Sequence, residues 1–198
     1  RTLLKEKRLS TLVDVRISRN DFLQSSFEDV YKKLEGNFVV QRADLEVGGQ
    51  EGTFFIHEIN EWNRMQEIFQ QEENFSEVII SPLIEGHSVS MLGCATHKGT
   101  LSSMLQLQFI DVPEALGQRS PSGNFLGHDW SFVDWDISIE KQAQKIVESI
   151  GEHMYTNGYR GIFGIDFVYD VKTKKLYTLE CNPRPTGALP IYSLMTML

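Results

Sequence analysis

The feature that most constrains the fold is a pair of apolar segments near the end of the 198-residue sequence, residues 161–169 and 176–182. The polar stretch 170–175 separates them. Short apolar runs on either side of a polar turn predict a β-hairpin. The rest of the chain therefore has to fold around a sheet that includes this hairpin.

Charged and amide side chains interrupt the apolar pattern of the hairpin. Residues two apart in a strand point to the same side of a sheet, so Glu180 and Asn182 share a face while Cys181 lies on the other. Asp166, in the partner strand, reaches that face if the pairing register allows. Two carboxylates and an amide oxygen form the donor set that hard cations such as Mg²⁺ prefer, and Arg184 follows on the same parity. The alternative is an exposed hairpin whose polar residues face water.

Elsewhere, strands and helices are mixed along the chain, which predicts an α+β fold. Alternating or compact apolar runs predict strands at 14–17, 37–42, 53–57, 77–84, 88–95 and 101–109. Apolar spacings of three and four predict helices that begin near Ser25 and near Asn60, and a third across 139–154. The spacing of Ser25 and Glu28 is that of a capping box, and Asn60 is a common N-cap residue type.

Residues 114–136 have no clear period and are predicted to form a long loop, a kind of segment that often carries function. The elements on either side form two sets. We therefore expect two unequal lobes, residues 1–80 and 81–198.

Composition excludes several classes of protein. The balance of 19 basic and 27 acidic residues gives a net charge of −8, which disfavours a nucleic-acid partner. No apolar run approaches the roughly 18 residues that span a bilayer, so no membrane partner is expected. The two cysteines, Cys94 and Cys181, are too few for a disulfide framework, and a reducing, cytoplasmic location is expected. Because the sequence begins with Arg and ends in an apolar run, we expect a piece of a longer protein.

Two strings, Gly161–Val168 and Thr178–Gly187, resemble the closing signature of the ATP-grasp superfamily. The resemblance implies two α+β lobes with ATP in the cleft between them. It also implies that Asp166, Glu180 and Asn182 bind two Mg²⁺ ions, with Mn²⁺ as an alternative, and that Arg184 acts beside the γ-phosphate. The substrate-binding domain that precedes these lobes in the family would lie outside this chain.

The resemblance further implies the residues that bind ATP. A glycine-rich loop, 47–52, would close over the phosphates, and a hinge, 81–86, would read the adenine edge through the Pro82 carbonyl and the Ile84 amide. Val39 and Val168 would lie above and below the adenine ring. The implied ATP-binding residues are Val39, Gln41, Gly48, Gly49, Gln50, Gly52, Ser81, Pro82, Leu83, Ile84, Glu85, Ser88 and Val168.

The sequence departs from the family pattern at two of these positions. Gln41 stands where most members carry a phosphate-binding lysine, so Arg42 or another basic residue would have to compensate. Ser88 stands where an acidic residue usually holds the ribose hydroxyls, and Glu85 is the nearest acid.

The resemblance implies an ATP-dependent ligase that phosphorylates a small-molecule carboxylate and joins the acyl phosphate to an amine. Within the long loop, Arg119 is a candidate to hold a substrate carboxylate and His128 a candidate base near neutral pH; both could instead be solvated loop residues. A carboxylase or carbamoyl-phosphate type of enzyme that uses bicarbonate is one alternative. The departures at Gln41 and Ser88 motivate another, a nucleotide-binding module without turnover. ATP-grasp enzymes often form homodimers, although nothing in the sequence marks an interface.

Overall fold

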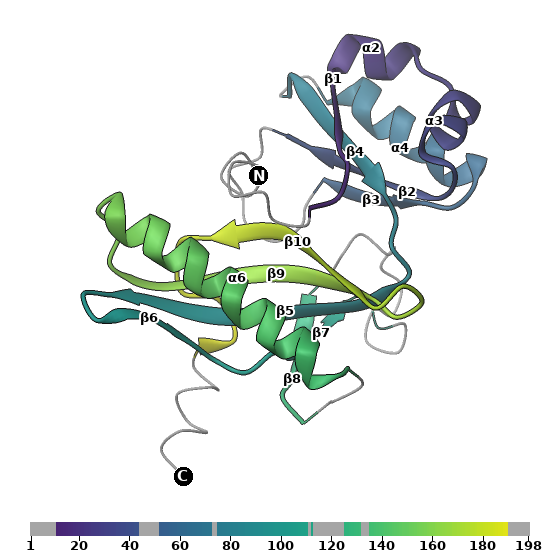
Figure 1. Cartoon of the computed structure of the whole chain (residues 1–198). Helices are drawn as coiled ribbons and strands as arrows, with labels where there is room; N and C mark the ends of the chain where they lie inside the picture. Colours follow the sequence, from purple (N-terminus) through teal and green to yellow (C-terminus); the bar gives the residue numbers. More distant parts are fainter. Residues whose placement is uncertain are drawn as a thin grey trace. The chain divides into compact units, whose positions relative to one another are not determined.

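The computed structural model describes residues 11–43, 52–72, 75–110, 112, 125–131 and 135–189. These residues form two compact units (Figure 1). The chain passes from the smaller unit to the larger one after Ile84, so that the predicted boundary at residue 80 lies inside a strand of the smaller unit.

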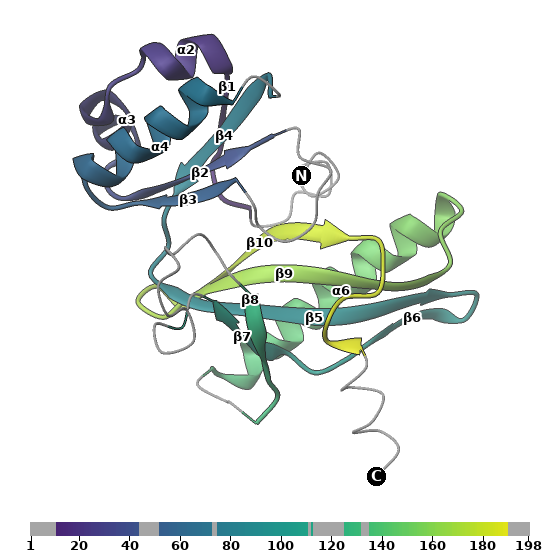
Figure 2. The same cartoon turned by 180° about the vertical axis from the view of Figure 1, so that it is seen from behind.

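The smaller unit contains an antiparallel sheet in the order β1-β4-β2-β3. Its described elements are β1 (Val15–Ser18), α2 (Arg19–Gln24), α3 (Phe27–Leu34), β2 (Phe38–Arg42), β3 (Thr53–Ile56), α4 (Ile59–Gln71) and β4 (Glu77–Pro82). The helices lie together on one side of this sheet (Figures 1 and 2). The other side of the sheet is therefore free of helices among the described residues of the unit.

Aromatic side chains fill the space between these helices and the sheet. The ring centroid of Phe22 lies 5.2 Å from that of Trp62, and the Phe38 centroid lies 5.8 Å from Trp62. Burying rings of this size supplies much of the stability of a small core. Because Phe38 points into the core, its strand neighbour Val39 points to the opposite face, and Gln41 follows Val39.

The starts of two helices differ from the predictions by one or two residues. The Ser26 hydroxyl caps α3 by accepting a hydrogen bond from the Asp29 backbone N–H at 3.1 Å. Ser25 is instead the C-cap of α2. Helix α4 begins after Glu58 rather than after Asn60, because the Glu61 carboxylate accepts the Glu58 backbone N–H at 3.3 Å. Side-chain capping of the first-turn amides decides both starts.

The larger unit contains a sheet in the order β10-β9-β5-β7-β8, with β6 paired to β5. Its described elements are β5 (Gly86–Thr96), β6 (Gly99–Ser102), β7 (Gln106–Ile110), β8 (Phe125–Asp129), α6 (Ile137–Thr156), β9 (Gly161–Asp170) and β10 (Lys175–Asn182). The predicted hairpin is confirmed as β9 and β10, which pair antiparallel.

Two predictions in this unit are wrong. The predicted strand 101–109 is two strands, because Ser103 leaves the ladder and its hydroxyl accepts the Leu92 backbone N–H at 2.9 Å. Strand β8 lies inside the stretch predicted to be a loop. Its residues, FLGHD, mix apolar and polar side chains with a glycine, so no periodic signal marked it.

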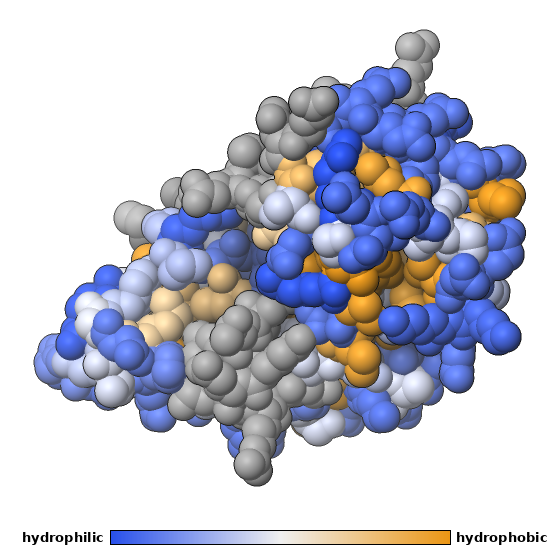
Figure 3. All heavy atoms as spheres, turned by 90° about the horizontal axis from the view of Figure 1, so that it is seen from above, coloured by the Kyte–Doolittle hydropathy of each residue, from blue (hydrophilic) through white to orange (hydrophobic). Residues whose placement is uncertain are grey.

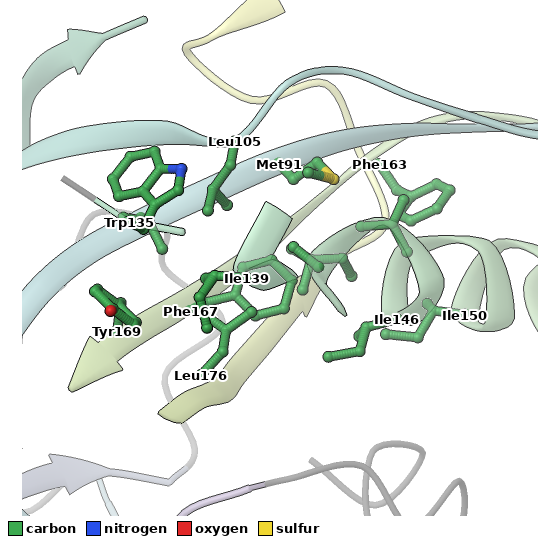
Figure 4. Packing of buried hydrophobic residues seen from close by; sticks show 14 of the residues in the cluster. Met91, Leu105, Trp135, Ile139, Ile146, Ile150, Phe163, Phe167, Tyr169 and Leu176 are labelled. Atoms are coloured by element: carbon green, nitrogen blue, oxygen red, sulfur yellow. The ribbon is translucent and has the colours of Figure 1, made fainter. Parts of the chain in front are cut away.

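One long helix, α6, covers one face of this sheet (Figure 4). Met91, Phe163 and Phe167 from the sheet are fully buried in the same cluster as Ile146 and Ile150 of α6. The alternation of side chains along β5 and β9 then assigns the residues between them to the opposite face of the sheet. This face carries Ser88, Ser90 and Asp166.

No helix among the described residues is long and apolar enough to cross a membrane. The face in Figure 3 is largely hydrophilic, with smaller hydrophobic areas among the hydrophilic residues.

Gly93 provides a test of the packing in the larger unit. A Cβ atom at Gly93 would lie 2.3 Å from Cζ of the buried Phe163 ring. We expect Gly93→Ala to lower the free energy of unfolding by about 1–3 kcal/mol, measured by urea denaturation, because a filled core resists an added methyl group. In the Phe163→Leu background the same substitution should cost less. An equal cost in both backgrounds would contradict the contact.

Candidate functional site

The candidate site begins at a β-bulge in β10. The strand pairs regularly as far as Thr178, opposite Phe167, and resumes with Glu180 opposite Asp166, so Leu179 is an extra residue. Thr178 therefore shares the buried face of Phe167. Glu180, two residues later, lies on the opposite face with Asp166.

Asn182 joins the two carboxylates on that face. Its amide Nδ2 donates to Oδ2 of Asp166 at 2.8 Å and to Oε1 of Glu180 at 3.0 Å. The structure thus brings together Asp166, Glu180 and Asn182, as the hairpin pattern predicted.

The surroundings of Asp166 perturb its ionisation. Burial, and then the charge of Glu180, raise the pKa of Asp166 from 3.8 to about 7. A cation placed between two such carboxylates would favour their ionised forms. No group of three or more His, Cys, Asp or Glu side chains in the described residues is arranged to hold a metal ion. The donor set is instead two carboxylates and one amide. The oxygens of the two acids fit a hard divalent cation such as Mg²⁺, and the Asn182 side chain, whose NH₂ now points at both acids, would have to turn to offer Oδ1.

A chain of hydrogen bonds continues from Asp166 across the sheet. Gln108 Nε2 donates to Oδ1 of Asp166 at 3.1 Å, and the Ser88 hydroxyl donates to Oε1 of Gln108 at 2.8 Å. Ser88 was predicted to contact ribose, and in the structure its hydroxyl is engaged by Gln108. Sequence reasoning missed Gln108.

A second set of polar contacts lies beside the first. Gln106 Nε2 donates to the Ser90 hydroxyl at 2.8 Å, and His128 Nε2 lies 3.3 Å from the same hydroxyl. Burial lowers the pKa of His128 to about 4, so the imidazole is neutral at pH 7 but only a weak proton acceptor, and its role as a base stays a prediction. The alternation of Gln106 and Gln108 with apolar residues could have placed both glutamines on one face of a strand, although not beside Asp166.

Three other predicted site residues lie in the larger unit. Val168 pairs with Ser88 across β9 and β5, so the two share the polar face. Glu85 forms an exposed ion pair with Lys172. Arg184 is exposed, and its Nη1 donates to the Pro185 carbonyl at 3.2 Å, so the structure does not bring its guanidinium to the two carboxylates.

The remaining described candidates lie in the smaller unit. Gln41 Nε2 donates to the Thr53 hydroxyl at 3.3 Å, on the face without helices. Arg42 points the other way and pairs with Glu72 at 2.6 Å, so the suggestion that Arg42 compensates for a missing lysine is wrong. Adjacent residues of a strand point to opposite faces of the sheet, so Arg42 cannot share the face of Gln41.

The hinge residues Ser81, Pro82, Leu83 and Ile84 end the first stretch of the smaller unit, Leu12–Ile84. Ser81 is buried and pairs with Val39, and the Leu83 backbone N–H donates to the Asn37 carbonyl at 2.9 Å. In the glycine-rich loop only Gly52 is described, with a φ of +86° that favours glycine. Gly48, Gly49, Gln50 and Arg119 lie outside the described residues.

Removing the charge of Glu180 tests the cause of the raised Asp166 pKa. Glu180→Gln should lower the Asp166 pKa below about 7, because the repulsion disappears, but leave it above 3.8, because the burial remains. The measurement is a ¹³C NMR titration of the Asp166 carboxyl without divalent cations, with Glu148→Gln on α6 as the control.

The same pKa predicts a pH dependence of stability. The folded chain holds the Asp166 proton more tightly than the unfolded chain does, so this group favours folding increasingly as the pH falls from about 7 towards 3.8. That gain should be smaller in Glu180→Gln than in Glu148→Gln. An Asp166 pKa that is the same in both variants would show that Glu180 is not the cause.

Solved structures with the same fold include enzymes of two kinds. N5-carboxyaminoimidazole synthetase from Staphylococcus aureus, complexed with ADP, shares 15% identity over 98% of this chain and 45% of its own, with a TM-score of 0.67. D-alanine-D-alanine ligase from Coxiella burnetii shares 15% identity over 91% of this chain and 44% of its own, with a TM-score of 0.59. D-alanyl-alanine synthetase A from Vibrio cholerae shares 10% identity over 91% and 52%, with a TM-score of 0.68.

This chain spans about half the length of those proteins. No curated protein sequence matches it significantly. The sequence model of an ATP-grasp domain matches residues 46–188, which is well over half of the chain. The chain therefore belongs to the ATP-grasp domain family, with the α+β fold of that family.

Proposed function

We propose that this chain is the nucleotide- and metal-binding part of an ATP-dependent ligase. The reaction would transfer the γ-phosphate of ATP to a small-molecule carboxylate, and an amine would then attack the acyl phosphate to give an amide, ADP and phosphate. The observation that carries the proposal is the pair of carboxylates, Asp166 and Glu180, opposite one another in the β9–β10 register and bridged by Asn182.

Asp166, Glu180 and Asn182 would hold Mg²⁺, or Mn²⁺ in its place. When bound, the cation would supply positive charge against the phosphate oxygens of ATP. The two acids also explain how a chain with a net charge of −8 can bind an anionic nucleotide, since part of that charge would be neutralised by the metal. Catalysis in such a site rests on positioning and electrostatics rather than on a covalent nucleophile.

The remaining predicted contacts complete the proposal. Val39 and Val168 would contact adenine, and the Pro82 carbonyl and Ile84 amide would bind its edge. Arg184 is exposed at the end of the hairpin, where its side chain would have to leave the Pro185 carbonyl to reach a phosphate.

The structural relatives support the class of reaction and leave the substrates open. One is described as a complex with ADP, and carboxyaminoimidazole ribonucleotide synthase from Aspergillus clavatus as a complex with ATP. The names of the relatives indicate different products, a carboxyaminoimidazole and a D-alanine dipeptide. A reaction in which bicarbonate accepts the phosphate is therefore the alternative within this class.

A nucleotide-binding module without turnover is the second candidate. It is favoured by the chemistry at the end of β2, where Gln41 is uncharged and bonded to Thr53, and where Arg42 is paired with Glu72. Neither residue offers a free cation to a phosphate.

Turnover by the full-length protein distinguishes the two candidates. With ATP, Mg²⁺ and a panel of carboxylates and amines, we expect release of ADP that depends on both acceptors. Bicarbonate is included in the panel as a further acceptor. Binding of ATP without acceptor-dependent ADP from any combination would favour the module and contradict the ligase.

A substitution tests the site directly. Loss of a residue that orients a metal ligand typically costs roughly 10–100-fold in activity. Because Glu180 is proposed as a ligand itself, Glu180→Gln should reduce turnover by more than that. It should also weaken Mn²⁺ binding, measured by electron paramagnetic resonance in the presence of a non-hydrolysable ATP analogue. Glu148→Gln on α6 is the matched control and should behave like the wild type. Wild-type turnover in Glu180→Gln would refute the metal assignment.

A further inference from the structure

We infer that Gln108 and Ser88 are positioning residues that fix the carboxylate of Asp166 for metal binding. The inference deepens the proposed function and rests on it, because it concerns how one proposed ligand is oriented. It starts from the hydrogen bonds of Gln108, whose Nε2 donates to Oδ1 of Asp166 at 3.1 Å and whose Oε1 accepts the Ser88 hydroxyl at 2.8 Å.

The orientation of the Gln108 amide is determined by its two partners. In the metal-binding state Asp166 is ionised and only accepts hydrogen bonds, so it requires the NH₂ end of the amide. The carbonyl end is then left for Ser88, whose hydroxyl has to donate. A flipped amide would place its oxygen against the oxygen of Asp166, and that arrangement would be repulsive. The chain from Ser88 through Gln108 to Asp166 therefore has one direction.

The sheet order makes this contact an unusual one. Strand β5 lies between β7 and β9, so the Gln108 side chain reaches across a whole strand to touch Asp166. Two strand spacings amount to roughly 10 Å. On the polar face β5 carries Ser88 and Ser90, and Ser90 is directly opposite Asp166 in the register. Side chains as small as serine leave the space through which the glutamine passes.

The Asp166 carboxylate is thereby held at both oxygens. Gln108 holds Oδ1 from the side of β5 and β7, and Asn182 of β10 contacts Oδ2 at 2.8 Å. Glu180 is bonded to the same Asn182 amide. The Gln108 contact thus directs Oδ2 towards Glu180, where both acids can reach one cation. Without it, Asp166 could rotate about its side-chain bonds, and the donor set would lose its preorganisation.

Mn²⁺ affinity tests this role by a readout other than turnover. Electron paramagnetic resonance of the full-length protein, with a non-hydrolysable ATP analogue present, would give Kd for Mn²⁺. We expect Gln108→Leu to raise Kd by about 10–100-fold, the usual effect of losing a residue that orients a metal ligand. Ser88→Ala should raise it less, and Ser88→Thr, which keeps the hydroxyl, should restore it. Gln142→Leu, at an exposed position of α6, is the control.

The double variant separates positioning from general loosening of the fold. If Ser88 acts through Gln108, then Ser88→Ala combined with Gln108→Leu should have the Kd of Gln108→Leu alone. Gln108→Asn keeps the amide but is one methylene shorter, so it should also raise Kd for Mn²⁺. It provides a second test if the leucine variant does not fold.

The possible failures can be told apart. Wild-type Kd in Gln108→Leu and Gln108→Asn, with weak binding in Glu180→Gln, would overturn the positioning role and leave the metal site intact. Additive effects of the two substitutions would overturn the coupling between Ser88 and Gln108. If the wild-type protein bound no Mn²⁺, the proposed metal site would be wrong and this inference with it.

Discussion

The packing of α6 against one face of the larger sheet is the interaction on which the rest of that unit depends. Burying Met91, Phe163 and Phe167 under the helix fixes which side of β5 and β9 faces the core. Strand geometry then leaves Ser90 and Asp166 on the other side. The hydrophobic core thus determines where polar chemistry can occur, although none of its residues takes part in that chemistry.

The bulge at Leu179 determines which face of the sheet Glu180 occupies. Before the bulge, the strand presents Leu176 and Thr178 to the core, and an unbroken alternation would send Glu180 there as well. One extra residue reverses the parity, so that Glu180 and Asn182 emerge beside Asp166. Burying the Glu180 carboxylate in the core would cost several kcal/mol, and the bulge avoids that cost.

Periodicity predicted the parts of the fold whose signals are local. The hairpin and α6 were predicted from short-range apolar patterns, and parity predicted that Glu180 and Asn182 share a face. Their position beside Asp166 depends on the bulge at Leu179, which no apolar pattern marks. Features that depend on pairing between distant strands were not predictable. Gln108 meets Asp166 only because β5 separates β7 from β9 by one strand, and nothing in the sequence near Gln108 encodes that order.

The central claim is that Asp166 and Glu180 together bind a divalent cation that accompanies ATP. Anomalous diffraction from crystals of the full-length protein grown with Mn²⁺ and a non-hydrolysable ATP analogue tests it most directly. The account predicts an anomalous peak at coordination distance, about 2.2 Å, from oxygens of both carboxylates and beside the phosphates. Bound nucleotide with the Mn²⁺ peak elsewhere and neither carboxylate coordinated would contradict it.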